Sequence, residues 1–473
     1  MIGRAFANRS SLRAILKNET KLSELRFGRW ISVSSNGPEE AELSGKRFAA
    51  LWGNGDYGRL GQGSLESQWS PKALPPSLFD NQSLREIACG GAHTLFLTEN
   101  GHVYASGLND YGQLGVSADD RGYIIEPLEV AGLPKEILKV SAGYHHSSAI
   151  TVDGELYMWG KNTNGQLGLG KRREQGMHIF HCEAATILST PSKVKFLTGV
   201  TVKIISLGFE HSIAVTDKGE TLSWGGGGSG RLGHGHQSGI LGLFKSDSEY
   251  TPRLVKELEG FKIKNAAAGM LHSVCISENG SVYVFGERAK KKLGYGEASN
   301  NSVPSMVDEI PYSEKAACGG YHTCVITGAR SRVPCIFHRV PATSYQHRYQ
   351  FLFIGGGELY VWGTNENGCL GIGSTDVAHS PERVEGPFLR HSVSEVSCGW
   401  KHTAAISGGN VYTWGWGGSH GTFSVEGHSS GGQLGQGSDV DYIEPTIVNF
   451  HRHMKALQIS CGFNHTGAIL EYS

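Results

Sequence analysis

The sequence predicts an all-β protein, a seven-bladed β-propeller that spans residues 48–473. Three observations predict this fold: a Trp-Gly strand motif recurs along the chain, a Gly-x-x-His strand motif follows each copy, and the two chain ends supply complementary halves of one unit. A unit this small cannot bury both faces of its sheet alone. The units must therefore pack on one another around an axis.

The first motif is a short β-rich strand, such as VYVFG or LYVWG, followed by a Gly-rich turn. In the first copy this turn, read from Gly53, has the G-x-G-x-x-G spacing of a dinucleotide-binding loop. Such a loop requires a following helix and occurs once per domain, whereas glycines and prolines follow Gly58 and the motif recurs. We therefore interpret it as a structural turn. The seven copies begin at Ala50, Val103, Leu156, Thr221, Val282, Leu359 and Val411.

The second motif places one histidine in each unit, as in CGGAHTLFLTENG. Glu-Asn-Gly, Val-Asp-Gly and Asp-Lys-Gly after such strands are typical of tight hairpin turns. Histidines spread around a ring cannot converge on one metal ion, and a neighbouring Ser or Thr offers each a local hydrogen bond. We interpret them as buried structural histidines. They are His93, His146, His211, His272, His322, His402 and His465.

The chain ends predict how the ring closes. The first unit begins at its Trp-Gly strand, and the last unit ends at its Gly-x-x-His strand. Pairing His465–Leu470 with Phe48–Trp52 completes one blade from both termini and removes two exposed strand edges.

The repeated V-Y-x-W-G, N-x-x-G-x-L-G and C-G-x-x-H-T segments resemble the regulator of chromosome condensation repeat over residues 48–473. The resemblance implies a seven-bladed propeller. In this family such propellers serve as guanine-nucleotide exchange factors, as an ultraviolet-B receptor, or as non-catalytic platforms that bind partners. The repeat by itself does not choose among these functions.

One column of the repeat argues against light sensing. The ultraviolet-B receptor carries clustered tryptophans in G-W-R-H-T segments, and only Gly399–Thr403 is close to that pattern here. We therefore predict no tryptophan cluster for photoreception. The column contains Gly91, Tyr144, Phe209, Met270, Gly320, Trp400 and Phe463.

From the remaining motifs we predict no metal site, no cofactor and no enzymatic site. The cysteines lack the C-x-x-C spacing of zinc sites, and Gly165–Lys171 nearly spells a phosphate-binding loop but is followed by Arg172 instead of Ser or Thr. Four cysteines share a column that holds small or apolar residues elsewhere, so we expect them to pack as apolar side chains. The column contains Cys89, Ala142, Leu207, Ala268, Cys318, Cys398 and Cys461. Trp52, Trp159, Trp224, Trp362 and Trp414 are expected to pack between blades.

The composition of the N-terminal segment predicts an organellar targeting peptide. Residues 1–35 contain seven basic residues and two acidic residues, a net charge of +5, whereas the whole chain carries −1. A helix there would be cationic and amphipathic, which is typical of a mitochondrial transit peptide. Residues 36–47 are interpreted as a linker. No apolar run approaches the length of a membrane span, so we expect a matrix protein.

Departures from the repeat mark candidate contact sites. Two basic loops follow Trp-Gly strands and are predicted to contact RNA phosphates or an acidic partner. An expanded loop in the last unit is predicted to contact a protein. The insertion 328–354 has no acidic residue and no repeat pattern, and we interpret it as an alternative or retained segment of the gene model. The candidate residues are Lys171, Arg172, Arg173, Arg288, Lys290, Lys291, Lys292, His420, Phe423 and Glu426.

Leader and repeat together resemble the plant mitochondrial branch of the family. That resemblance implies a non-enzymatic scaffold in a mitochondrial RNA-processing complex, which supports intron splicing and thereby the assembly of respiratory complex I. The alternative is an exchange factor or regulator of a mitochondrial GTPase. Chromatin binding would need a broad basic face, which the sequence lacks.

Overall fold

The computed structural model describes residues 45–116, 122–134, 136–170, 186–235, 248–287, 301–328, 356–418, 431–450 and 454–472. The leader 1–35, most of the linker and the insertion beyond Gly328 lie outside the described residues. The propeller lies within the unit Arg47–Glu471.

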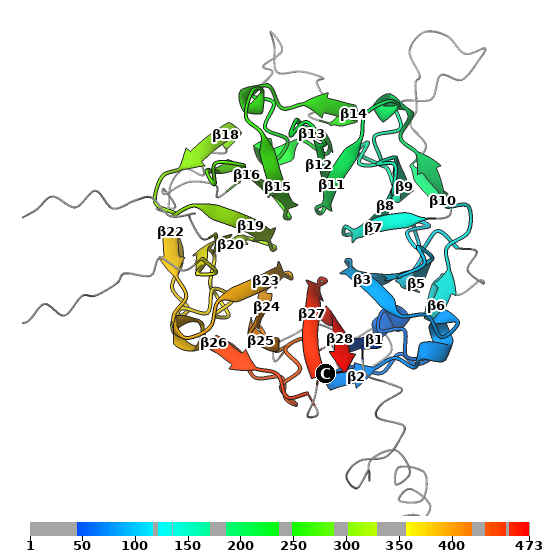
Figure 1. Cartoon of the computed structure of the whole chain (residues 1–473), viewed down its shortest axis with the longest axis vertical. Coiled ribbons are helices and arrows are strands. Elements are labelled where there is room, and N and C mark those ends of the chain that lie inside the picture. Colours follow the sequence, from blue (N-terminus) through cyan, green and yellow to red (C-terminus); the bar gives the residue numbers. More distant parts are fainter. Residues whose placement is uncertain are drawn as a thin grey trace, which may run out of the picture. The chain divides into compact units, whose positions relative to one another are not determined.

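Seven four-stranded antiparallel sheets radiate from a central axis, which confirms the predicted seven-bladed propeller (Figure 1). Blade 1 contains β3 (Leu84–Cys89), β4 (His93–Thr98), β5 (Val103–Leu108) and β6 (Tyr123–Glu129). Blade 2 contains β7 (Ile137–Ala142), β8 (His146–Thr151), β9 (Leu156–Lys161) and β10 (Ile187–Lys193). Blade 3 contains β11 (Val202–Leu207), β12 (His211–Thr216), β13 (Thr221–Gly225) and β14 (Glu249–Leu254).

The next three blades repeat this order, with the first strand nearest the axis. Blade 4 contains β15 (Ile263–Ala268), β16 (His272–Ser277), β17 (Val282–Gly286) and β18 (Asn301–Val307). Blade 5 contains β19 (Ser313–Cys318), β20 (His322–Thr327), β21 (Leu359–Gly363) and β22 (Ala378–Arg383). Blade 6 contains β23 (Val393–Cys398), β24 (His402–Ser407), β25 (Asn410–Gly415) and β26 (Tyr442–Ile447).

Blade 7 is built from both ends of the propeller. Its sheet order is β2-β1-β28-β27, where β27 is Met454–Cys461, β28 is His465–Tyr472, β1 is Arg47–Gly53 and β2 is Gln68–Ala73. Phe48 pairs with Leu470 and Trp52 with Thr466. The predicted closure of one blade by the two termini is therefore confirmed.

The second strand of each blade is buried on both faces because neighbouring blades cover it. Every residue of β4, β8, β12, β16, β20 and β24 is buried, whereas the residues of a fourth strand such as β10 are half-buried or exposed. Apolar clusters therefore join adjacent blades: Ile150 and Met158 of blade 2 pack in one cluster with Ala214 and Trp224 of blade 3. Each such large side chain contributes roughly 1.5–3 kcal/mol on burial.

The glycine of the repeated Leu-Gly pair lets one blade approach the tryptophan of the next. A Cβ at Gly168 would lie 2.8 Å from Nε1 of Trp224, and the backbone there has φ +68°. The tryptophans predicted to pack between blades are all buried. The apparent phosphate-binding loop at Gly165–Gly170 is therefore part of a blade contact.

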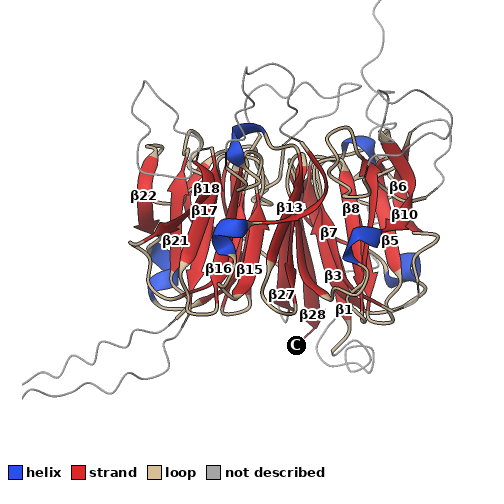
Figure 2. Cartoon of the chain, turned by 90° about the horizontal axis from the view of Figure 1, so that it is seen from above, coloured by secondary structure: helices blue, strands red, loops and turns tan. Residues whose placement is uncertain are grey.

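The ring has two different ends (Figure 2). At the Gly-x-x-His end, the inner strand turns into the second strand, and the third strand leads to the fourth; η1 (Asp56–Gly58) and η4 (Gly228–Gly230) lie in these latter loops. At the hairpin end, the second strand turns into the third and the connectors between blades cross. These connectors contain η2 (Pro76–Phe79), η3 (Lys195–Leu197), η5 (Lys256–Leu258) and η6 (Gly386–Leu389).

Candidate partner-binding site at the channel mouth

A histidine side chain bridges every pair of neighbouring blades. The Nε2 atom of His93 in blade 1 lies 2.9 Å from Oγ of Ser147 in blade 2. The other six bridges are His146–Ser212, His211–Ser273, His272–Thr323, His322–Thr403, His402–Thr466 and His465–Thr94. The histidines are at most 5% exposed, so their predicted structural role is confirmed.

The hydrogen bonds of these histidines are not local, which corrects the sequence-based expectation. Consecutive residues of a strand point to opposite faces of the sheet. The hydroxyl residue next to each histidine therefore faces the neighbouring blade on the opposite side. Thr94, beside His93, is hydrogen-bonded to Nε2 of His465 in blade 7. The same pair of residue types thus joins each blade to both of its neighbours.

Among the described residues, a main-chain carbonyl fixes the tautomer of six of the seven bridges. Ser147 donates its hydroxyl proton to the carbonyl oxygen of Gln113, which also accepts the indole N–H of Trp159. Because that proton is committed, the Ser147 oxygen accepts from Nε2–H of His93. Burial lowers the pKa of His93 and of His146 to about 3, so these rings are neutral near pH 7.

Main-chain hydrogen bonds also circle the axis at this end. The amide of Gly91 donates to the carbonyl of Gly143 in the next blade, and Tyr144 donates to Gly208. Phe463 of blade 7 donates back to Gly90 of blade 1. The first position of Gly-x-x-His is a glycine because a Cβ at Gly90 would lie 2.3 Å from Cε1 of the His93 ring.

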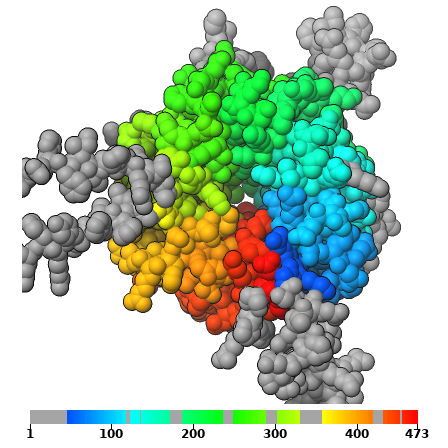
Figure 3. Space-filling model, in the orientation of Figure 1, coloured from blue at the N-terminus to red at the C-terminus, as the bar shows by residue number. Residues whose placement is uncertain are grey.

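A channel runs through this region at the hollow centre of the ring (Figure 3). The space is about 450 Å³, including the part that is open to solvent. The cysteine column and the small residues of the inner strands line it. Its mouth is surrounded by the column that argued against light sensing, which runs from Gly91 to Phe463. All seven cysteines that the structure describes are free thiols.

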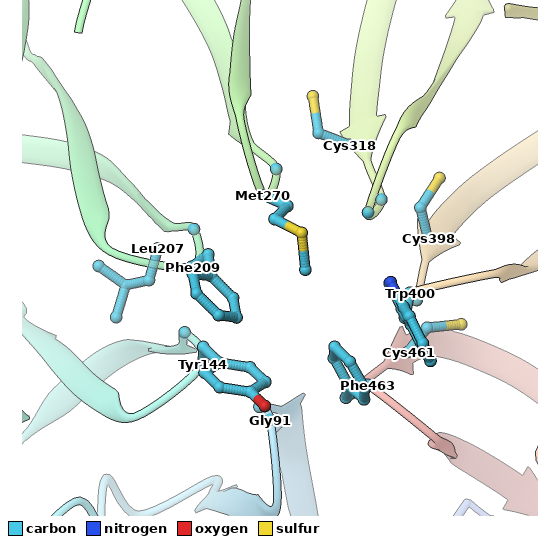
Figure 4. Close-up of a pocket in the computed structure, with 18 of the residues that line it drawn as sticks. Gly91, Tyr144, Leu207, Phe209, Met270, Cys318, Cys398, Trp400, Cys461 and Phe463 are labelled. Carbon is cyan, nitrogen blue, oxygen red and sulfur yellow. The ribbon is translucent and has the colours of Figure 1, made fainter. Parts of the chain in front are cut away.

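Aromatic side chains gather on part of the mouth and point toward its opening (Figure 4). The Trp400 and Phe463 rings stack 4.5 Å apart at 12°, and the Tyr144 ring lies 4.1 Å from Phe209 and 5.2 Å from Phe463. The indole N–H of Trp400 is buried and has no hydrogen-bond partner among the described residues. The mouth thus offers stacking surfaces and one free donor.

Charged residues alternate with these rings. Lys401 lies 4.9 Å from the Trp400 ring and 3.6 Å from a carboxylate oxygen of Glu366. Lys161 lies over the Tyr111 ring, 5.3 Å from its centroid. A partner would therefore meet an apolar, aromatic surface with partly neutralised cations.

Arg59 adds a buried cation beside the mouth. It is 5% exposed, and its guanidinium donates to the carbonyls of Asp56 and Gly91. Burial lowers its pKa to about 10. Its position next to Gly91, which contributes no side chain to the mouth, leaves this cation close to the channel.

The repeats and this geometry match a known family. An RCC1-like domain model matches residues 42–240, and the regulator of chromosome condensation (RCC1) repeat matches residues 218–276, 279–326, 356–406 and 427–469. The chain is 31% identical over 365 residues to the RCC1 domain-containing protein RUG3, mitochondrial, of Arabidopsis thaliana, with 75% of this chain and 72% of that protein covered. The chain belongs to the RCC1 repeat family.

Plant relatives and a yeast structure extend the comparison. The chain is 29% identical over 421 residues to the ultraviolet-B receptor UVR8 of Arabidopsis thaliana, covering 88% of this chain and 81% of the receptor. These matches support its place in the plant branch of the RCC1 family. The structure of Prp20p from Saccharomyces cerevisiae shares the fold at a TM-score of 0.69 and 19% identity, covering 93% of this chain and 97% of that one.

Within this RCC1 propeller, sequence reasoning missed one aromatic contact. Trp416 packs edge-on against Trp400, with ring centroids 5.8 Å apart, and is 4% exposed. It lies in Trp-Gly-Trp-Gly-Gly, immediately after the Trp-Gly strand of its blade. A second tryptophan at that position was the available signal.

The predicted contact residues lie outside the described residues. They are Lys171, Arg172, Arg173, Arg288, Lys290, Lys291, Lys292, His420, Phe423 and Glu426. The strands that flank these segments are β9 and β10, β17 and β18, and β25 and β26. Each pair joins a third strand to a fourth, so the chain leaves and re-enters the ring at the Gly-x-x-His end. No helix in the described part of the chain is long and apolar enough to cross a membrane.

Proposed function

We propose that the protein is a non-enzymatic mitochondrial scaffold that supports organellar transcript processing, in particular intron splicing, and through it the assembly of respiratory complex I. One observation carries the scaffold assignment: an aromatic channel mouth that differs from blade to blade sits on a ring held by repeated bridges. The basic leader and the mitochondrial relative support the location. The splicing role rests on the resemblance to plant mitochondrial members.

The partner surface in this proposal is the Gly-x-x-His end. Partly exposed rings such as Tyr144 and Trp400 give stacking area to a protein side chain or an unpaired base. Lysines of the mouth are paired with acidic residues, as Lys401 is with Glu366. Contact with RNA therefore falls to the basic loops Lys171–Arg173 and Arg288–Lys292, whose flanking strands open at the same end.

The test is recovery of the tagged whole chain from isolated mitochondria after ultraviolet crosslinking, with sequencing of bound RNA and identification of co-purifying proteins. Intron-containing transcripts and RNA-processing proteins are expected. Changing Lys290, Lys291 and Lys292 to Glu should lower RNA recovery, because phosphate contacts are lost. The matched control is Lys218→Glu, an exposed lysine in a turn at the hairpin end, which should leave recovery unchanged.

The exchange-factor alternative makes a different prediction in the same sample. A GTPase regulator would co-purify with a matrix GTPase in a nucleotide-sensitive way and would accelerate nucleotide release from it. The segment containing His420, Phe423 and Glu426 would then be the contact. Recovery of such a GTPase without enriched RNA would contradict the splicing proposal.

A further inference from the structure

The junction between blades 5 and 6 is chemically distinct because it carries a thiol on each side. At every junction, the residue two positions after the histidine faces the end of the next inner strand. A Cβ at Gly467, for example, would lie 3.2 Å from Sγ of Cys89. At the junction of blades 5 and 6 these residues are Cys324 and Cys398. The residues that match Cys324 are Leu95, Ser148, Ile213, Val274, Ala404 and Gly467.

A histidine completes the group. One ring nitrogen of His322 and the Sγ atoms of Cys324 and Cys398 lie within 4.8 Å of one another. His322 is 1% exposed and Cys324 is fully buried, whereas Cys398 lines the channel. The three atoms thus form a cluster of which Cys398, labelled in Figure 4, is the member that lines the channel.

Hydrogen bonding prepares His322 to act as a ligand. Thr403 donates its hydroxyl proton to the carbonyl of Cys369, so its oxygen accepts from Nε2–H of His322. The lone pair is therefore on Nδ1, which has no hydrogen-bond partner among the described residues. The two thiols are what distinguish this junction, because this feature is shared by the bridge histidines His93, His146, His211, His402 and His465. An outer hydrogen bond that fixes the tautomer and the ring orientation is characteristic of metal-bound histidines.

We propose that His322, Cys324 and Cys398 bind a zinc ion that links blades 5 and 6. Zinc takes imidazole and thiolate ligands, and a neutral histidine with two thiolates gives Zn²⁺ a net charge of zero. Cu(I) in the same site would leave a net negative charge in an apolar junction, which favours zinc. On binding, the two thiol protons leave to solvent through the channel, and water from the channel takes the fourth position.

The distances allow this coordination after a small movement. Bond lengths of about 2.3 Å to sulfur and 2.0 Å to nitrogen place tetrahedral ligand atoms roughly 3.5–3.8 Å apart. The present separations are up to 4.8 Å, so the ligand atoms must approach by about 1 Å. Rotation of the two cysteine side chains supplies a movement of that size.

The test compares metal content and affinity between the whole chain and two single variants. Each protein is loaded with Zn²⁺, freed of excess metal, and measured by elemental analysis and by competition with a chromogenic chelator. Cys324→Val, which copies Val274 of blade 4, should lose one equivalent of zinc and weaken binding by more than ~100-fold. Cys461→Ala is the control: it removes a thiol of the same column at the next junction, where Ala404 takes the place of the second thiol. This variant should still bind one equivalent of zinc.

The comparison is needed because the chain has further histidines and cysteines outside the described residues. Cobalt substitution provides a second measurement: a thiolate-to-cobalt charge-transfer band should be present in the wild type and in Cys461→Ala. It should weaken in Cys324→Val and in Cys398→Ala, which copies Ala142 and Ala268. Equal zinc content in the wild type, Cys324→Val and Cys461→Ala, or binding of Cu(I) without Zn²⁺, would overturn the proposal.

Discussion

Two columns of side chains, two residues apart in the same turn, behave in opposite ways. The histidine column is identical in all seven blades and is buried between them, whereas the mouth column ranges from Gly91 to Trp400 and lines an opening. The first column satisfies a constraint that every junction shares, the hydrogen bond to the next blade. The second column is free of that constraint, and its variation therefore indicates where an individual partner is recognised.

Lowering the pH should have the largest effect on stability, because it favours protonation of the histidines that are buried between the blades. Burial lowers the pKa of His93 and His146 to about 3 and that of His211 and His465 well below the usual 6.5. At a pH between the lowered pKa values of the folded chain and the usual value of about 6.5 in the unfolded chain, the unfolded chain binds more protons. The free energy of unfolding should therefore fall as pH decreases below about 7.5, by roughly 6 kcal/mol in total for four such groups at pH 5.5.

Urea unfolding at a series of pH values from 8 to 5 measures this loss. The free energy should be nearly constant above about pH 7.5, where both states are neutral at these sites. His93→Gln should reduce the slope below pH 6.5 by about 1.4 kcal/mol per pH unit. A flat profile down to pH 5 would show that these histidines have the same pKa in the folded and unfolded chains, which would contradict the prediction.

Filling a glycine at a blade junction should have the next largest effect. A Cβ at Gly371 would lie 2.7 Å from Nε1 of the buried Trp414, at φ +71°. Gly371→Ala should lower the free energy of unfolding by ~3–5 kcal/mol, since it combines overpacking with an unfavourable backbone conformation.

Gly373→Ala is the matched control. It has a similar φ of +79°, but its Cβ would approach only the flexible Glu444 carboxylate, at 3.2 Å. It should cost ~1–2 kcal/mol in denaturant unfolding. Equal losses for both variants would assign the effect to the backbone alone.

Removing one bridge should cost less than filling a junction glycine. His211→Ala deletes the bond to Ser273 and leaves a cavity between blades 3 and 4, which predicts a loss of ~2–4 kcal/mol. Ser273→Ala should lose ~1–3 kcal/mol because it leaves Nε2–H of His211 buried and unpaired. Denaturant unfolding of the two single variants and the double variant gives their coupling; losses that simply add would contradict a direct bond.

Mouth substitutions should leave stability almost unchanged while changing recognition. Tyr144→Ala should alter the free energy of unfolding by at most ~1 kcal/mol, because the ring is partly exposed and makes no bridge. It should reduce recovery of co-purifying proteins about tenfold, as expected for an aromatic contact at the centre of an interface. Unchanged recovery would move the partner surface away from the channel.

Repeat periodicity explains what the sequence revealed. Seven copies of each motif predicted the blades, and the incomplete units at the ends predicted the pairing of Phe48 with Leu470. The burial of the histidines followed from their regular placement. Their bonding partners did not, because adjacent residues such as His93 and Thr94 face different junctions, which only the packed ring makes visible.

The group of His322, Cys324 and Cys398 shows a second limit of the sequence. Two of its members, His322 and Cys324, are two positions apart in β20. The third, Cys398, comes from the next blade, 74 residues after Cys324. Spacing patterns such as C-x-x-C detect ligands that share one turn, whereas this group depends on blade packing. The contacts predicted for Lys290–Lys292 and for His420–Glu426 stay predictions.

The pairing of β1 with β28 imposes an order on folding. Arg47 of β1 pairs with Glu471 of β28, so one edge of β1 must stay unpaired until β28 has been synthesised. Contacts of such long sequence separation form slowly, and an unpaired strand edge invites association with other chains. The seam in blade 7 is therefore the last part of the ring to form. A chain permuted to begin and end at a hairpin turn would move this seam, and with it the period of vulnerability, to another blade.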